Sequence, residues 1–140
     1  MVNMDLLTRV RLYLVSVAVF VVIDGIWLAF IAQPFYSANL GIFMAEQPNW
    51  LAAGLFYLLY LAGIQVFVLE PGFRGVGLSK IAILGGLFGL MCYATYDLTN
   101  LATIEGWPVI VTVVDLVWGT VLTATVSVTT AVISKKLGWH

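Results

Sequence analysis

The chain alternates four long apolar stretches with short segments that carry proline, glycine and charge. The apolar stretches cover roughly residues 12–32, 50–69, 81–102 and 108–133. Each is close to the length of about 20 residues that an α-helix needs to cross a bilayer. The pattern predicts an all-α membrane protein, a four-transmembrane-helix bundle that forms a single domain over residues 1–140.

Proline marks the expected ends of these helices. Gln33-Pro34 is expected to end the first helix, because proline cannot extend a helix and restricts the residue before it. A turn is expected at residues 70–72, where the second span stops. Pro108 is well placed as the first residue of the fourth span.

The first loop, over residues 34–48, carries an apolar pattern of its own. Its large apolar side chains follow a spacing of 0, 4, 7 and 8, which puts them on one face of a helix. A short helix with one apolar face is typical of a segment lying in the membrane interface, so we expect a short interfacial helix in this outer loop. The residues with this spacing are Tyr36, Leu40, Phe43 and Met44.

The basic residues indicate how the bundle is oriented. All six fall on one side of the predicted bundle, and the two loops on the other side contain none. Cytoplasmic loops of membrane proteins carry an excess of Lys and Arg. We therefore expect both termini to be cytoplasmic and the protein to lie in a bacterial inner membrane as a multi-pass protein. The basic residues are Arg9, Arg11, Arg74, Lys80, Lys135 and Lys136.

Composition supports the membrane class and excludes several others. Hydrophobic residues make up 62% and charged residues 9%, against about 25% charged in soluble domains. The net charge of −1 gives no case for nucleic acid as a partner, whereas the lipid bilayer is the expected one. The one cysteine, Cys92, excludes an internal disulfide, and with His140 alone it cannot build a transition-metal cluster. No metal is expected, and any cofactor stays unknown.

Three aspartates lie within the predicted spans at similar depth. Counting about 1.5 Å per helical residue, Asp24 lies about 18 Å from the cytoplasmic start of its span and Asp97 about 24 Å from the start of its own. Asp115 lies about 20 Å from the inner face of a core about 30 Å thick. The three carboxyls can therefore meet in the outer half of the membrane.

No Lys, Arg or His lies in the spans to neutralise these carboxyls. A charge at the centre of a membrane helix costs about 2.5–3.5 kcal/mol, so the carboxyls should face the bundle interior, with at least one protonated at neutral pH. Polar and aromatic residues stand one turn away on the same helix faces. The candidate ligand- or proton-binding residues are Asp24, Trp27, Tyr93, Tyr96, Asp97, Asn100, Asp115 and Trp118. The alternative is that they only hydrogen-bond one helix to another.

Two glycines suggest a close helix contact. Gly85 and Gly89 are four residues apart, the small-xxx-small spacing that lets two membrane helices approach closely. The contact is expected either within the bundle or across a homodimer or larger assembly.

Longer motifs resemble a known family. The run over residues 93–108, together with residues 114–119 and 23–28, is similar to the small bacterial membrane proteins of domain of unknown function 2177. The resemblance covers nearly the whole chain, including Asn49-Trp50 and Phe56-Tyr57. It implies a multi-pass membrane protein and supplies no activity.

Three functions are compatible with these residues. The first is binding or transport of a small molecule, lipid or cation through a protonatable three-Asp pocket, which favours a homodimer or larger assembly because four helices enclose little volume. The second is a structural or accessory membrane subunit. The third is a membrane enzyme acting on a lipid or quinone with two carboxyls as acid and base, although no catalytic residue is identified.

Overall fold

The computed structural model describes residues 4–73 and 75–139. Arg74 and His140, which enter the charge and metal arguments above, lie outside the described residues. The described part consists of helices and their connecting loops, without strands. Its elements are α1 (Leu6–Trp27), η1 (Leu28–Ala32), α2 (Gln33–Leu40), η2 (Gly41–Phe43), α3 (Trp50–Ile64), η3 (Gln65–Leu69), α4 (Glu70–Gly72), α5 (Leu78–Thr103) and α6 (Val109–Lys136).

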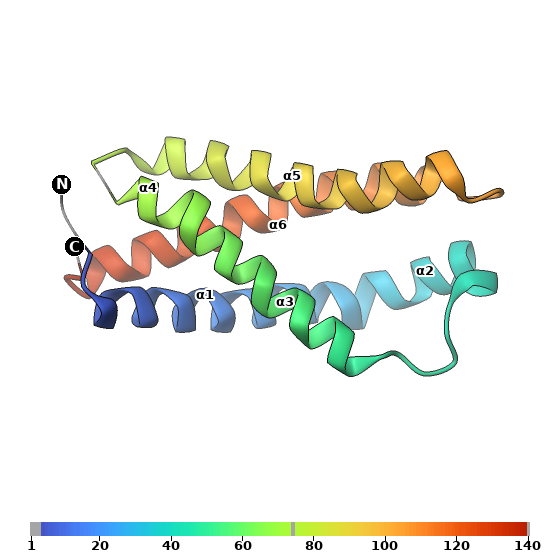
Figure 1. Cartoon of the computed structure of the whole chain (residues 1–140), viewed down its shortest axis with the longest axis horizontal. Coiled ribbons are helices and arrows are strands. Elements are labelled where there is room, and N and C mark those ends of the chain that lie inside the picture. Colours follow the sequence, from blue (N-terminus) through green and yellow to red (C-terminus); the bar gives the residue numbers. More distant parts are fainter. Residues whose placement is uncertain (1–3, 74, 140) are drawn as a thin grey trace.

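These elements form four helical rods that are long and apolar enough to cross a membrane, as the sequence predicts. The rods cover Leu6–Phe43, Trp50–Gly72, Leu78–Thr103 and Val109–Lys136. Figure 1 shows both termini and the α4–α5 connection at one end of the bundle, with α2 and the α5–α6 turn at the other. The second rod, α3–α4, crosses the others obliquely, and its N-terminal end lies well away from α5.

The prediction that Gln33-Pro34 ends the first helix is wrong. α2 continues the line of α1, and the combined rod holds 38 residues, or about 57 Å at 1.5 Å per residue. The π-helix η1 ends at Ala32, two residues before the proline, and the Gln33 N–H donates to the carbonyl of Leu28, five residues back. This wider turn relieves the contact between the Pro34 ring and the preceding turn that would otherwise break the helix.

The second rod uses the same device. The π-helix η3 is followed directly by Glu70 and Pro71, and the Glu70 N–H donates to the carbonyl of Gln65, again five residues back. The two segments, residues 28–34 and 65–71, therefore pass a proline in the same way, with the π-turn placed just before it. The helical conformation extends through Gly72, so residues 70–72, where a turn is expected, are still helical.

The residues predicted to form a separate interfacial helix are instead the far end of the first rod. The apolar face of α2 packs against the α5–α6 turn, where buried Leu40 meets Trp107 and Val111. The Trp107 Nε1–H donates to the Thr112 hydroxyl at 3.2 Å, which fixes the indole in this position. Tyr36 and Leu40 of the predicted apolar face thus pack within the protein, whereas Phe43 and Met44 remain 41% and 48% exposed.

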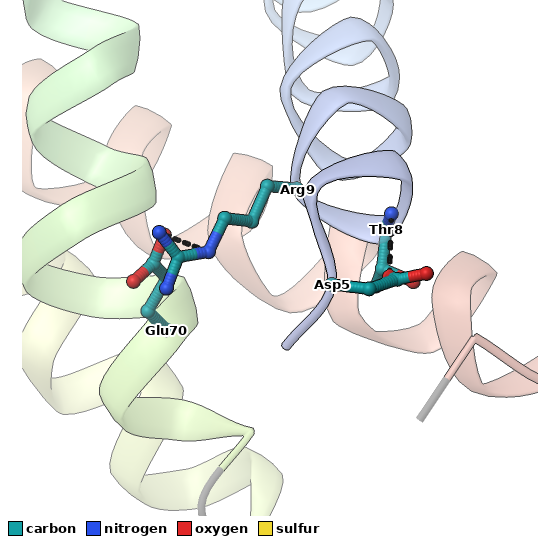
Figure 2. A network of polar contacts seen from close by, with 4 residues as sticks. All are labelled: Asp5, Thr8, Arg9 and Glu70. Atoms are coloured by element: carbon teal, nitrogen blue, oxygen red, sulfur yellow. Dashed lines mark hydrogen bonds and ion pairs between the residues drawn. The ribbon is translucent and has the colours of Figure 1, made fainter. Parts of the chain in front are cut away.

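The half of the bundle near the termini is a packed apolar core. Phe20, Leu61, Ile64, Leu122 and Val126 are among its buried members, and they come from α1, α3 and α6. Polar contacts close this end. Figure 2 shows Arg9 of α1 reaching Glu70 of α4, with 3.5 Å between Arg9 Nε and Glu70 Oε1, and the Asp5 carboxylate accepting from the Thr8 backbone N–H at the start of α1. The Arg11 guanidinium lies 5.4 Å from the centre of the Trp139 ring.

The glycines predicted to pack helices lie between α5 and α6, which make the most extensive helix contact of the bundle. A Cβ added to Gly85 would lie 2.8 Å from Ser127 Oγ and 3.0 Å from the Thr123 carbonyl oxygen. A Cβ on Gly89 would overlap the Gly119 carbonyl oxygen and the Thr123 hydroxyl. Both glycines thus allow close approach within the bundle, and this approach brings the Asp-bearing parts of α5 and α6 together.

Candidate functional site

A cavity of about 510 Å³ lies between the helices in the half of the bundle away from the termini. Its wall is mostly aromatic and apolar, and all three membrane aspartates contribute to it. Lining residues from one helix are neighbours in sequence or stand three to four residues apart, which keeps them on one side of that helix. The lining residues are Asp24, Trp27, Leu28, Tyr36, Leu40, Met44, Phe56, Tyr57, Cys92, Tyr93, Tyr96, Asp97, Asp115 and Trp118.

Seven of the eight candidate site residues line this one cavity, and Asn100 does not. Asn100 is three residues beyond Asp97, which turns it about 60° around the helix and one turn closer to the outer end. It lies beside the Tyr96 side chain instead. The lining also includes residues outside the predicted set, most importantly Tyr36 and Tyr57.

Asp115 is held by a residue that sequence reasoning placed in the interface. The hydroxyl of Tyr36 in α2 donates a hydrogen bond to Asp115 Oδ1 in α6, across 79 residues of sequence. This contact depends on the helix continuing through Pro34, because only then does α2 run beside the outer part of α6. Tyr36 and Leu40 share a helical spacing. Had this face been interpreted as buried against the protein rather than as lying in the membrane interface, it would have indicated Tyr36.

Asp24 is held by side chains of α6 and α3. Its Oδ1 accepts a hydrogen bond from the Trp118 Nε1–H at 3.3 Å, and the Tyr57 side chain lies beside the same carboxyl. The Trp118 ring stacks on the Trp27 ring, with centroids 4.2 Å apart and planes inclined by 10°. The first and last spans each carry an Asp-x-x-Trp segment, Asp24 to Trp27 and Asp115 to Trp118. These two segments contact each other through their stacked tryptophan rings.

Asp97 is different from the other two. Its side chain is 0% exposed, and neither carboxyl oxygen has a hydrogen-bond partner among the described residues. The Asp115 carboxyl of α6 is close enough to share a hydrogen bond with the Asp97 carboxyl when one of the two is protonated, and the Thr112 hydroxyl donates at 3.5 Å to the backbone carbonyl of Asp97 rather than to its carboxyl. Leaving a buried polar group without a partner costs about 1–3 kcal/mol, and more for a charged group.

The cavity contains no positive charge of its own. Its lining, drawn from the described residues, includes no Lys, Arg or His. Within the same described part, no group of three Asp, Glu, Cys or His side chains is arranged to hold a metal ion. The site therefore presents carboxyl groups and aromatic rings to whatever enters.

The cavity is open at one side. Three of its lining residues are about half exposed: Tyr96 of α5 at 57%, Phe56 of α3 at 52% and Met44 of the loop before α3 at 48%. Phe56 belongs to α3 and Tyr96 to α5, so the exposed part of the lining lies at the side of two spanning helices. The three aspartates are themselves 6% exposed or less, so a small molecule reaches their carboxyls past these half-exposed side chains.

Comparison with known proteins identifies a family but no activity. The sequence model of a family described as "Predicted membrane protein (DUF2177)" matches residues 9–132. Searches of curated proteins and of solved structures give no significant match. The match contains all three aspartates and the whole cavity lining.

Proposed function

The chain belongs to this family of predicted membrane proteins, and we propose that it binds a small molecule or lipid inside the membrane and carries it. The proposal assigns the ligand to the acidic cavity, with Asp97 as the group that contacts it. Asp24 and Asp115 are the partners that shape the site. A cavity of about 510 Å³ falls within the range of about 300–1,000 Å³ typical of small-molecule sites.

One observation carries this proposal: the carboxyl of Asp97 is fully buried, lines the cavity and has no partner among the described residues. Buried polar groups are hydrogen-bonded in the great majority of cases. The Asp97 carboxyl has one polar neighbour on another helix, the Asp115 carboxyl of α6, which can bond to it only when one of the two is protonated. No donor group of the described residues satisfies the Asp97 oxygens, which favours a ligand as the missing partner.

A structural role is the second candidate, because two of the three aspartates have the contacts that it requires. Asp115 accepts from Tyr36 and Asp24 accepts from Trp118, and each contact joins two different helices. Such interhelical hydrogen bonds are worth about 0.6 kcal/mol on average in a membrane. We therefore assign Asp24 and Asp115 a share in holding the bundle together, and the ligand contact to Asp97.

We also propose that the protein spans a bacterial inner membrane as one four-helix domain with both termini in the cytoplasm. The support is that the α1 start, the α4–α5 connection and the α6 end, which carry the basic residues, share one end of the bundle (Figure 1). The cavity then belongs to the outer half of the membrane.

Binding is the step that the geometry supports most directly. The half of the bundle toward the termini is filled by the core around Leu61, Ile64 and Leu122, so passage to the other side requires that core to open. A rearrangement of this size is easier to support in an assembly of two or more copies, which we propose for transport but not for binding.

The test is to identify what the purified protein retains. Wild-type protein, Asp97→Asn and Glu46→Gln are purified alike, and each is analysed by native mass spectrometry and by extraction of bound small molecules. Glu46 is exposed and lies outside the cavity lining, so its variant controls for the loss of one carboxylate. We expect wild type and Glu46→Gln to retain the same compound and Asp97→Asn, folded and of unchanged helicity, to lose it. Equal retention by all three proteins would return Asp97 to a structural role.

A further inference from the structure

We infer that the ligand of this cavity carries a positive charge on an organic group: it is an amphipathic amine or quaternary ammonium ion. The inference rests on the proposed binding function and names its substrate class. It is carried by two features of the cavity: the Asp97 carboxyl, which no donor group of the described residues satisfies, and the aromatic rings that line the same cavity.

The cavity is acidic, and the protein supplies no positive charge to it. Three aspartates line the cavity and no basic residue does. A carboxylate withdrawn from water is strongly disfavoured unless a counter-ion is near. The described basic residues lie at the ends of α1, α5 and α6 that carry the termini, at the opposite end of the bundle. A cationic group on the ligand would supply the counter-charge for the Asp97 carboxyl that the lining residues lack.

The walls suit an organic cation rather than a bare metal ion. Seven aromatic rings line the cavity, and the stacked pair of Trp27 and Trp118 lies beside the Asp24 carboxyl. The face of an aromatic ring attracts cations, and cages of such rings recognise quaternary ammonium groups. A hard metal ion instead needs about six oxygen ligands, and the described residues offer no such cluster.

The position of the opening indicates that the ligand is amphipathic. The exposed lining residues Phe56 and Tyr96 are aromatic, and they belong to the spanning helices α3 and α5 rather than to a connecting loop. A molecule entering there crosses apolar surroundings before it meets the carboxyls. A molecule with a hydrophobic body and one cationic group suits both the apolar entrance and the carboxyls. An inorganic ion suits only the carboxyls.

The test uses three probes of similar size that differ in charge: phenyltrimethylammonium, its neutral carbon isostere tert-butylbenzene, and benzenesulfonate. Cys92 is the only cysteine of the chain and lines the cavity, so slowing of its alkylation by N-ethylmaleimide reports occupancy at this site. Half-protecting concentrations are corrected for the partition of each probe into protein-free micelles. We expect the cation to protect at a concentration at least tenfold lower than the neutral isostere, a difference of about 1.4 kcal/mol.

The Asp97→Asn variant then separates charge recognition from simple filling of the cavity. It should reduce the preference for the cation to about threefold or less, the part left to the aromatic rings and the other two aspartates, while tert-butylbenzene protects Cys92 as it does in wild type. If the neutral isostere protects wild type as well as the cation does, or benzenesulfonate protects better, the inference of a cationic ligand is wrong and the cavity remains a binding site. Absence of protection by all three probes also overturns it, and the proposed binding function is then judged separately by the compound retained on purification.

Discussion

Replacing Gly89 by alanine should destabilise the bundle more than any other single glycine-to-alanine change in α5. The added methyl group would overlap the Gly119 carbonyl oxygen and the Thr123 hydroxyl, both on α6. Backbone atoms cannot move aside without shifting the helix that carries them. The change therefore pushes α5 and α6 apart just below the level at which Asp97 and Asp115 meet.

The expected magnitude follows from two opposing effects. Overpacking a close-packed interior costs about 1–3 kcal/mol. Alanine in place of glycine in a helix returns about 0.5–1 kcal/mol, because the unfolded chain loses less conformational freedom on folding. For Gly89 the first effect dominates, and we expect a net loss of roughly 1–2 kcal/mol in the free energy of unfolding.

The neighbouring glycines form a graded series of controls. At Gly85 the added Cβ lies 2.8 Å from Ser127 Oγ, which can rotate, and 3.0 Å from the Thr123 carbonyl oxygen, which cannot, so a smaller loss is expected. At Gly86 the nearest atom is at 3.4 Å, an ordinary contact, and at Gly54 of α3 nothing lies within 4 Å. Both of these variants should be as stable as wild type or slightly more stable.

The assay is reversible unfolding in mixed micelles, with helicity followed by circular dichroism as the fraction of denaturing detergent rises. All four alanine variants are compared with wild type under one set of conditions. The order of stability should be Gly54 and Gly86 above Gly85, and Gly85 above Gly89. A Gly89→Ala variant as stable as Gly54→Ala would mean that the two helices do not approach as closely as described here.

Three further changes test other parts of the structure. Tyr36→Phe should lower the free energy of unfolding by about 1 kcal/mol and speed hydrogen exchange in α2, because the hydrogen bond to Asp115 is lost. Unchanged exchange would mean that α2 does not pack against α6 there. Trp118→Phe should cost about 1 kcal/mol in wild type and clearly less in a variant that already carries Asp24→Leu, since the donor then has no partner; equal costs in both backgrounds would rule out the contact. Reporters fused after Lys136 or between α4 and α5 should be cytoplasmic, and one in the loop before α3 should be exterior; an exterior C-terminus would contradict the proposed orientation.

The regular geometry of a membrane helix explains how much the sequence predicts. Four apolar stretches of sufficient length are enough to predict four spanning helices. The constant rise per residue is enough to place Asp24, Asp97 and Asp115 at similar depth, and the structure brings them to one cavity.

Depth alone does not predict which helix faces meet. In a soluble protein the apolar face of a helix indicates its buried side, but these helices are apolar all round, so the pattern carries little information about rotation. The hydrogen bond from Tyr36 to Asp115 also depends on a helix that continues past Pro34, against the usual effect of proline. The π-turn that makes this continuation possible has no sequence signature beyond the proline itself.

The measurement that tests the central claim most directly is an experimental structure, at a resolution that shows small ligands, of the protein purified without any added ligand. The account predicts non-protein density inside the cavity, within hydrogen-bonding distance of an Asp97 carboxyl oxygen and in contact with aromatic rings of the wall. A cavity closed by its own side chains, with Asp97 hydrogen-bonded to a neighbouring helix, would contradict the account and leave the three aspartates as structural groups.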